Sequence, residues 1–190
     1  ADLTTYGVRI IDATPESAQL AAGGTFAAAS LDAVHAYGVG MEAQFAGKME
    51  DALRSFQQAA QLDPNFARAY SGMAAVLGNL GRVDEAQRDI QLAMQNVARM
   101  TDRERLRTRG LYYAQTGDLR KCVEEYGELV REYPADNIGH NNLANCLSGL
   151  RQTARAVEEA KLAVQIAPRS AAARNNLSLF SSYNGAFADG

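Results

Sequence analysis

The sequence predicts an all-α fold, a right-handed α-solenoid built from stacked helix-turn-helix repeats. Three observations predict it. Ala, the strongest helix former, occurs 35 times among 190 residues, whereas the β-branched Val and Ile together occur 15 times. Small, bulky and glycine positions recur at intervals of about 34 residues, which is typical of helical repeats. Within each period, apolar residues follow the spacing of one helical face.

The period is visible in columns of equivalent residues. Pro134 and Pro168 are 34 residues apart, as are Gly47 and Gly81. Two further columns share this period and a single insertion of two residues, one of them small and the other mostly bulky. Their members are Ala52, Ala86, Cys122 and Ala156, and Phe56, Ile90, Tyr126 and Ala160.

The period divides the chain into successive helix pairs. We expect full repeats at 33–66, 67–100, 103–136 and 137–170, and a partial fifth at 171–190 whose first helix spans 171–184 and turns at Asn184–Phe187. Gly47, Gly81 and Gly117 end the first helices of three repeats, and prolines close three of the second helices. A column of small residues in the first helices lets the second helix approach closely: Gly40, Ala74, Gly110 and Ala144.

Helix starts are also encoded. Thr101–Glu104 has the pattern of a capping box, and Asn65, Asp136 and Ser170 are predicted caps of their repeats. The two-residue insertion falls at 101–102, which predicts a longer second helix in the second repeat. Residues 1–32 lie outside the period, and we expect an N-terminal extension there, with a short helix that begins near Thr14 and ends before Gly23.

The pattern resembles the tetratricopeptide repeat family over roughly residues 33–187. A weaker resemblance, carried by Ser30–Tyr37 and Asp102–Leu106, is to such repeats fused to bacterial serine/threonine kinases, cyclases or transcriptional regulators. The resemblance implies a non-enzymatic scaffold, part of a larger signalling protein, that binds a protein or peptide segment in a concave groove. The alternative is a self-associating or sensory module that regulates an attached kinase or cyclase domain.

The resemblance places the peptide-binding groove on one face of the first helices. In that face, amide side chains are suited to hold a peptide backbone, because each carries donors and an acceptor. Arginines there would contact acidic ligands. The corresponding residues are Tyr37, Met41, Arg68, Ser71, Arg107, Leu111, Asn141, Asn142, Asn145, Asn175 and Asn176, followed by Tyr183.

No catalytic, metal or cofactor motif is visible in the sequence. His140 occupies an apolar column and is predicted to be a packed core residue, whereas His35 is predicted at the surface. Cys122 and Cys146 are predicted to pack as small apolar residues without a disulfide. Leu177 and Phe180 would lack a partner helix, which favours a chain cut from a longer repeat protein over a capping helix.

The charge pattern gives little support to a nucleic-acid partner. The net charge is −3, and the basic cluster at Arg99–Arg109 is predicted to be a solvated helix face rather than a docking site for an acidic partner or RNA. No segment is apolar enough to span a membrane, and no signal peptide is visible. We therefore expect a cytoplasmic protein whose partners are proteins or peptides, with homo-oligomers as a further option.

Overall fold

A computed structural model describes residues 30–188 of the chain, so the predicted short helix within 1–32 lies outside the described residues. Every regular element between residues 30 and 188 is helical, and the chain divides into two compact units, 1–104 and 105–190. The first contains α2 (Leu31–Phe45), α3 (Met49–Leu62), α4 (Ala67–Asn79), α5 (Val83–Gln95) and the 3₁₀ turn η2 (Val97–Arg99). Helix α6 (Asp102–Thr116) begins at the end of this unit. The second contains α7 (Leu119–Glu132), α8 (Asn137–Gly149), α9 (Thr153–Ile166) and α10 (Ala171–Ala188).

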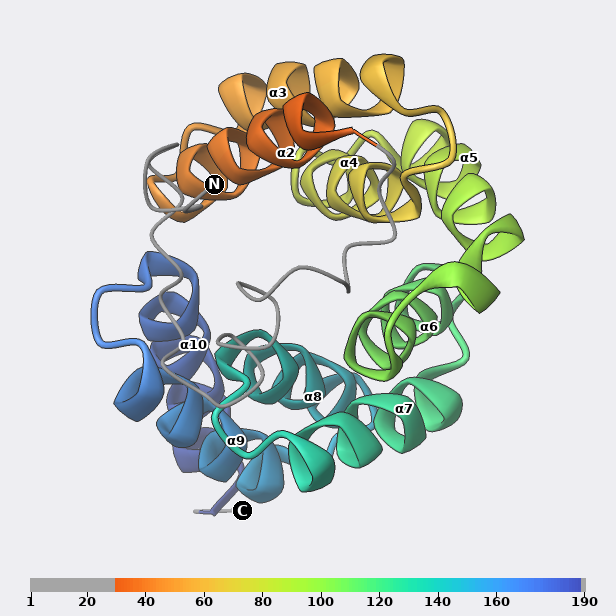
Figure 1. The fold of residues 1–190 in the computed structure, drawn as a ribbon. Helices are drawn as coiled ribbons and strands as arrows, with labels where there is room; N and C mark the ends of the chain where they lie inside the picture. The colour runs from red at the N-terminus through yellow and green to blue at the C-terminus, as the bar shows by residue number, and fades with distance from the viewer. Residues whose placement is uncertain (1–29, 189–190) are drawn as a thin grey trace. The chain divides into compact units, whose positions relative to one another are not determined.

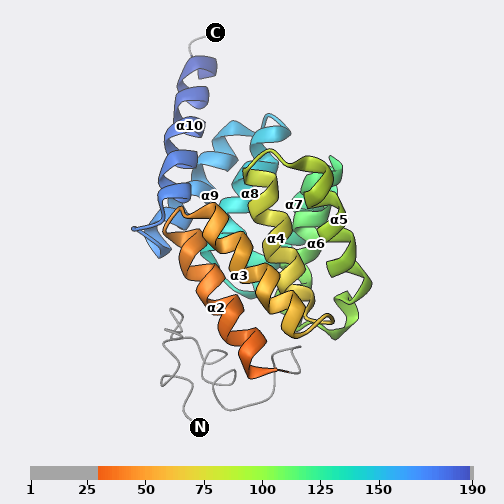
Figure 2. The same cartoon turned by 90° about the horizontal axis from the view of Figure 1, so that it is seen from above.

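Within each unit, consecutive helices lie side by side as antiparallel pairs. Figures 1 and 2 show α2 against α3 and α4 against α5 in the first unit, and α8 against α9 in the second. The first helix of each pair also lies near the first helix of the next, as α2 does to α4 and α8 to α10. This is the arrangement of an all-α solenoid of helix-turn-helix repeats.

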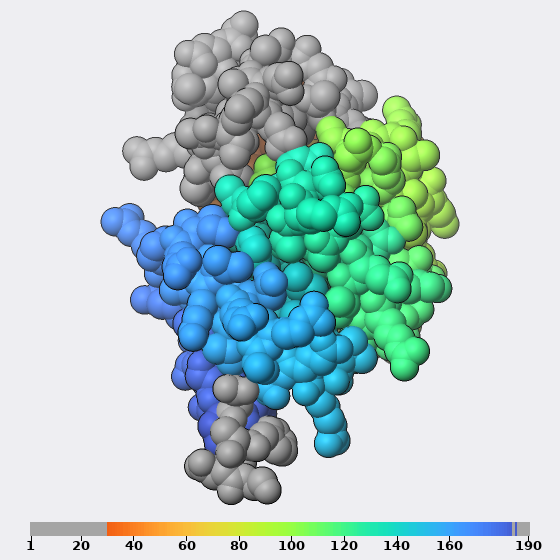
Figure 3. All heavy atoms as spheres, turned by 90° about the horizontal axis from the view of Figure 1, so that it is seen from below, coloured from red at the N-terminus to blue at the C-terminus, as the bar shows by residue number. Residues whose placement is uncertain are grey.

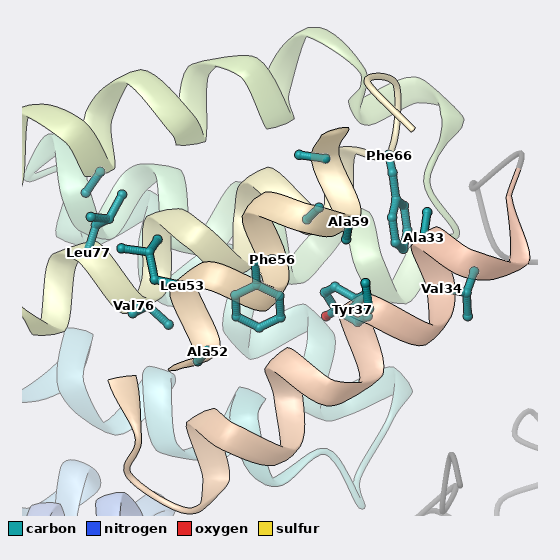
Figure 4. Packing of buried hydrophobic residues seen from close by; sticks show 14 residues of the cluster. Ala33, Val34, Tyr37, Ala52, Leu53, Phe56, Ala59, Phe66, Val76 and Leu77 are labelled. Carbon is teal, nitrogen blue, oxygen red and sulfur yellow. The ribbon is translucent and has the colours of Figure 1, made fainter. Parts of the chain in front are cut away.

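The core of the first unit is centred on Phe56, which is completely buried (Figure 4). Its ring lies 5.3 Å from that of Tyr37, and a Cβ added to Gly40 would meet the Phe56 ring at 2.6 Å. Gly110 stands in the same relation to the ring of Tyr126 in the second unit, with a contact at 2.7 Å. The prediction that small residues let the second helix approach closely is therefore confirmed at both glycines.

The turns inside the pairs need a left-handed backbone. Gly47, Gly81 and Gly117 have φ of 76°, 73° and 80°, as the helix-ending role predicts. The equivalent position in the next repeat is Arg151, which adopts φ of 60° although it has a side chain. The turn geometry is thus imposed by the packing of α8 on α9, and not by the glycine.

We predict that Arg151→Gly stabilises the protein by about 1 kcal/mol, because a left-handed conformation costs a residue with a Cβ about 1–2 kcal/mol and glycine regains most of it. Urea unfolding followed by circular dichroism measures the change. The matched control is Arg155→Gly in α9, which is expected to destabilise by about 1 kcal/mol. Equal effects of the two substitutions would contradict the role of backbone strain at Arg151.

Three of the predicted helix starts are confirmed, and one is wrong. Thr101 and Glu104 form a reciprocal capping box, with N···O distances of 3.1 and 3.3 Å. Asp136 Oδ1 accepts from the Gly139 N–H at 2.8 Å, and Ser170 caps α10. The prediction for Asn65 is wrong, because the buried Phe66 stands at the N-cap of α4 and no side chain caps this helix.

Two predictions about helix lengths are also wrong. Helix α5 has 13 residues, no more than its counterparts, because the 3₁₀ turn η2 absorbs the inserted residues. Helix α10 continues through Asn184–Phe187 to Ala188, where a turn was predicted. One glycine costs a helix only about 1 kcal/mol, so Gly185 does not end it.

Helix α10 packs the two side chains that were predicted to lack a partner helix against α8 and α9. Phe180 is buried and Leu177 packs against the same cluster, which includes Leu147, Ala156 and Ala160 of α8 and α9. The preceding pair of helices therefore covers Phe180 fully and Leu177 in part, on the side of α10 away from the second helix that the sequence analysis expected them to lack.

Candidate interaction surface

Helices α8 and α10 bring together most of the polar residues predicted for the groove. Asn176 Nδ2 donates to Asn141 Oδ1 at 3.0 Å, which joins the two helices one repeat apart. Asn141 in turn donates to Asn142 at 3.3 Å, and Asn142 Nδ2 donates to the Tyr126 hydroxyl of α7 at 3.1 Å. The asparagines thus form an internal chain of hydrogen bonds across three helices.

Other residues of the same two helices are exposed. Asn145 and Asn175 are exposed to solvent, and the side chains of Leu179 and Tyr183 are each 46% exposed. Residues 175, 179 and 183 are spaced by four and share one face of α10, while Asn145 and Leu179 occupy equivalent positions of successive repeats. We call Asn141, Asn145, Asn175, Leu179 and Tyr183 the α8–α10 surface.

Leu179 was missed by the sequence analysis. It stands at the position equivalent to Asn145, four residues after Asn175 and four before Tyr183, so the period itself carried the signal. In the structure the core face of α10 is occupied by Ala173, Leu177 and Phe180 instead.

The predicted groove residues of the first unit are largely engaged inside it. The Arg68 guanidinium lies 5.3 Å from the centre of the Tyr37 ring, donates to the Tyr37 hydroxyl and is 3.5 Å from Glu104. Tyr37 and Ser71 are buried, and Met41 packs against the core. Arg68 therefore joins three helices of its own chain.

Arg107 has a similar internal role in the second unit. Its guanidinium binds Oδ2 of Asp136 through Nη2 at 2.5 Å and Nε at 2.8 Å. The Asp136 side chain is completely buried, and its other oxygen caps α8. Leu111, the remaining predicted residue of α6, is half-buried.

The basic cluster at Arg99–Arg109 is partly neutralised. Besides the Arg107–Asp136 pair, Arg109 Nη2 lies 2.6 Å from Glu125 of α7. Burial raises the pKa of Glu125, and the charge of Arg109 acts in the opposite direction. Arg109 occupies a column that is apolar in the other repeats, and pairing with Glu125 lets a charged residue stand there.

His140 is buried, as predicted, but both ring nitrogens face acceptors. Nδ1 lies 2.6 Å from Glu159 of α9, and Nε2 lies 2.9 Å from the carbonyl of Pro134. Burial lowers the pKa of His140, but the hydrogen bonds to Glu159 and Pro134 outweigh it, so the pKa is raised above its usual value. The imidazolium form satisfies both acceptors at once. Asp136 is a further carboxylate whose charge favours this form.

We predict that the stabilising effect of His140 depends on pH. Because its folded pKa is raised, the effect is fully present below the unfolded pKa of about 6.5 and is lost as the pH rises through the folded pKa. The free energy of unfolding of the protein, relative to that of His140→Leu, should therefore decline from pH 6 to pH 9, as urea titrations would measure. The variant uses the residue found at the equivalent Leu106. A difference that stays constant with pH would contradict the prediction.

The two cysteines form a disulfide, contrary to the prediction that they pack as free thiols. Cys122 of α7 and Cys146 of α8 have their Cα atoms 6.1 Å apart, within the usual range, and both are buried. The sequence reasoning failed because it did not pair the two columns. Equivalent pairs, also separated by 24 residues, are Ala52 with Val76 and Ala156 with Phe180, and all four are buried.

Other kinds of site are not found in the part of the chain that the structure describes. Residues 30–188 contain no group of three His, Cys, Asp or Glu side chains placed to hold a metal ion. Among the same residues, no helix combines the length and the apolar character needed to cross a lipid bilayer.

Comparison with known proteins accounts for this architecture. The sequence model of a family described as "TPR repeat" matches residues 46–81, which hold α3 and α4, and the same helix-pair geometry recurs in the second unit. Residues 46–81 therefore match a tetratricopeptide repeat (TPR), and the chain is similar to proteins of that family. The human protein "Tetratricopeptide repeat protein 6" is 27% identical over 134 residues, covering 70% of this chain. The chain spans only 25% of the length of that relative.

Two solved structures show the same fold. TTC0263, a TPR protein of Thermus thermophilus, has a TM-score of 0.56 and 16% identity, and the match covers 80% of this chain and 83% of that one. A human IFIT1 dimer with m7Gppp-AAAA has a TM-score of 0.61 and 17% identity, and the match covers 80% and 39%. The TPR fold supports a general role as a scaffold for protein interactions.

Proposed function

We propose that this TPR chain is a non-enzymatic scaffold that binds a peptide or protein segment through the first helices of its repeats. The observation that carries the proposal is the α8–α10 surface. It combines exposed amides with the exposed apolar side chains of Leu179 and Tyr183. Amides can hold the backbone of a peptide, and the apolar pair can cover one of its side chains.

The other predicted groove residues contribute in different ways. In the first unit, Met41 would add an apolar contact, and the buried Tyr37 and Ser71 would support their own helices from within. In the second unit, Leu111 would add an apolar contact, and Asn142 and Asn176 would support the α8–α10 surface from within. Arg68 and Arg107 already bind carboxylates of the chain, so they are weaker candidates for contact with an acidic ligand.

Replacing the exposed asparagines of the α8–α10 surface tests the proposed peptide binding most directly. We would select peptides from a random phage-displayed library on the full chain and measure their binding by fluorescence anisotropy. Asn145→Ala combined with Asn175→Ala should weaken binding by about tenfold or more without changing the unfolding temperature. The matched control is Gln165→Ala, an exposed amide on the second helix α9, and this variant should bind normally. Residues 153–166 of α9 are coloured blue in Figure 3. Peptides that bind all three proteins equally would rule out the α8–α10 surface.

The alternative is self-association, or a sensory role next to an attached kinase or cyclase domain. It is favoured by exposed apolar residues on the second helices, such as Leu162 and Ile166 on α9. A self-associating chain would change its mass with concentration in light scattering. A mass that stays monomeric as the concentration rises would exclude self-association. The sensory role and the bacterial signalling context remain predictions from the sequence resemblance.

A cytoplasmic location also remains a prediction from the sequence. The Cys122–Cys146 disulfide weighs against it, because reducing systems keep most cytosolic thiols free.

A further inference from the structure

Charge is distributed unevenly between the helices of the second unit. Helix α8 contains no Asp, Glu, Lys or Arg among its 13 residues, and the 18 residues of α10 contain one, Arg174. The adjoining second helices differ sharply, since α7 alone carries seven charged residues within 14. Helix α6, also a first helix, carries several arginines, so the lack of charge is particular to α8 and α10, the two helices that form the α8–α10 surface.

His140, the one titratable side chain of α8, does not add a charge to the α8–α10 surface. His140 is turned toward Glu159 and the Pro134 carbonyl, and it is buried. Arg174 lies on a different side of α10 from residues 175, 179 and 183, whose positions follow the groove face. The α8–α10 surface thus offers hydrogen bonds and apolar contact without a charge of its own.

We propose that the α8–α10 surface selects an uncharged stretch of peptide, with no Asp, Glu, Lys or Arg in the residues that lie on it. This inference rests on the proposed function. A charged ligand side chain would lose water against this surface and find no counter-charge, which is unfavourable. A neutral segment has no charged side chain that must lose its hydration. Its backbone pairs with Asn145 and Asn175, and one of its apolar side chains covers Leu179 and Tyr183.

The composition of selected peptides is the first test. Phage-displayed random peptides are selected on the full chain, and those that also bind Asn145→Ala/Asn175→Ala/Leu179→Ala are removed. The remaining sequences should be depleted in charged residues relative to the unselected library. Their dissociation constants should change by less than about twofold between low and high salt, because screening acts only on charges. If every selected peptide also binds the triple variant, the proposed function itself fails at this surface.

Variants of opposite charge give the second test. Asn145→Asp and Asn145→Lys should weaken an uncharged peptide to a similar degree, because each replaces an amide by a charge that must lose water. An acidic ligand would bind tighter to the Lys variant and more weakly to the Asp variant, and a basic ligand would do the reverse. Either asymmetric result would overturn the inference and leave peptide binding intact. Gln165→Asp and Gln165→Lys on α9 are the matched controls and should bind like the unaltered chain.

Discussion

Replacing Arg107 by methionine is expected to destabilise the protein by about 3–5 kcal/mol, the usual range when one partner of a buried ion pair is removed. The Asp136 carboxylate that it binds is completely buried, and the Arg107 side chain is only 16% exposed. Methionine keeps much of the apolar stem of arginine but supplies no donor. The remaining carboxylate would then be charged and buried beside α8. Urea unfolding followed by circular dichroism measures the loss.

A second substitution separates the charge from the packing. Asp136→Asn removes the charge and keeps an oxygen that can accept from the Gly139 N–H, so the cap of α8 survives. The double variant Arg107→Met/Asp136→Asn should therefore recover much of the stability lost in the single variant. If both unfold at the same urea concentration, the cost lies in lost packing, and the buried charge is not its source.

The periodic features of the fold were predictable because they are local or recur in every repeat. The helix-ending Gly47, Gly81 and Gly117 and the capping box at Thr101 depend on residues within one turn of the chain. The close approach of Phe56 to Gly40 follows from columns that match in several repeats.

The candidate surface was predictable only in part. Helical spacing correctly placed Asn145 and Asn175 where they are exposed. It could not show that Arg107 would meet Asp136, because that pair joins residues 29 apart through one particular packing of α6 against the start of α8. Whether a polar side chain on a helix faces solvent or a partner is decided by its neighbours in space, and periodicity does not specify their charge.

Breaking the Cys122–Cys146 disulfide is expected to destabilise the protein by about 3 kcal/mol. The bond encloses the helical hairpin of α7 and α8, with a sequence separation of 24, and it lies near the end opposite the connecting loop. In the unfolded chain it removes the conformational freedom of that loop, and in the folded chain it holds α8 against α7. Reductant should therefore lower the urea midpoint of the unaltered chain.

The repeat itself supplies the control for this effect. Cys122→Ala/Cys146→Val installs the pair that is buried as Ala52 and Val76 in the first unit, so its packing should be tolerated. This variant should unfold near the urea midpoint of the reduced protein, and reductant should not change its midpoint. The reason is that the oxidised and reduced proteins differ in loop-closure entropy and hardly in side-chain volume. Thiol alkylation in denaturant reports the bond directly: neither cysteine of the chain as purified should react until reductant is added. A variant as stable as the oxidised chain would mean that the covalent link adds nothing to what apolar packing of α7 on α8 already provides.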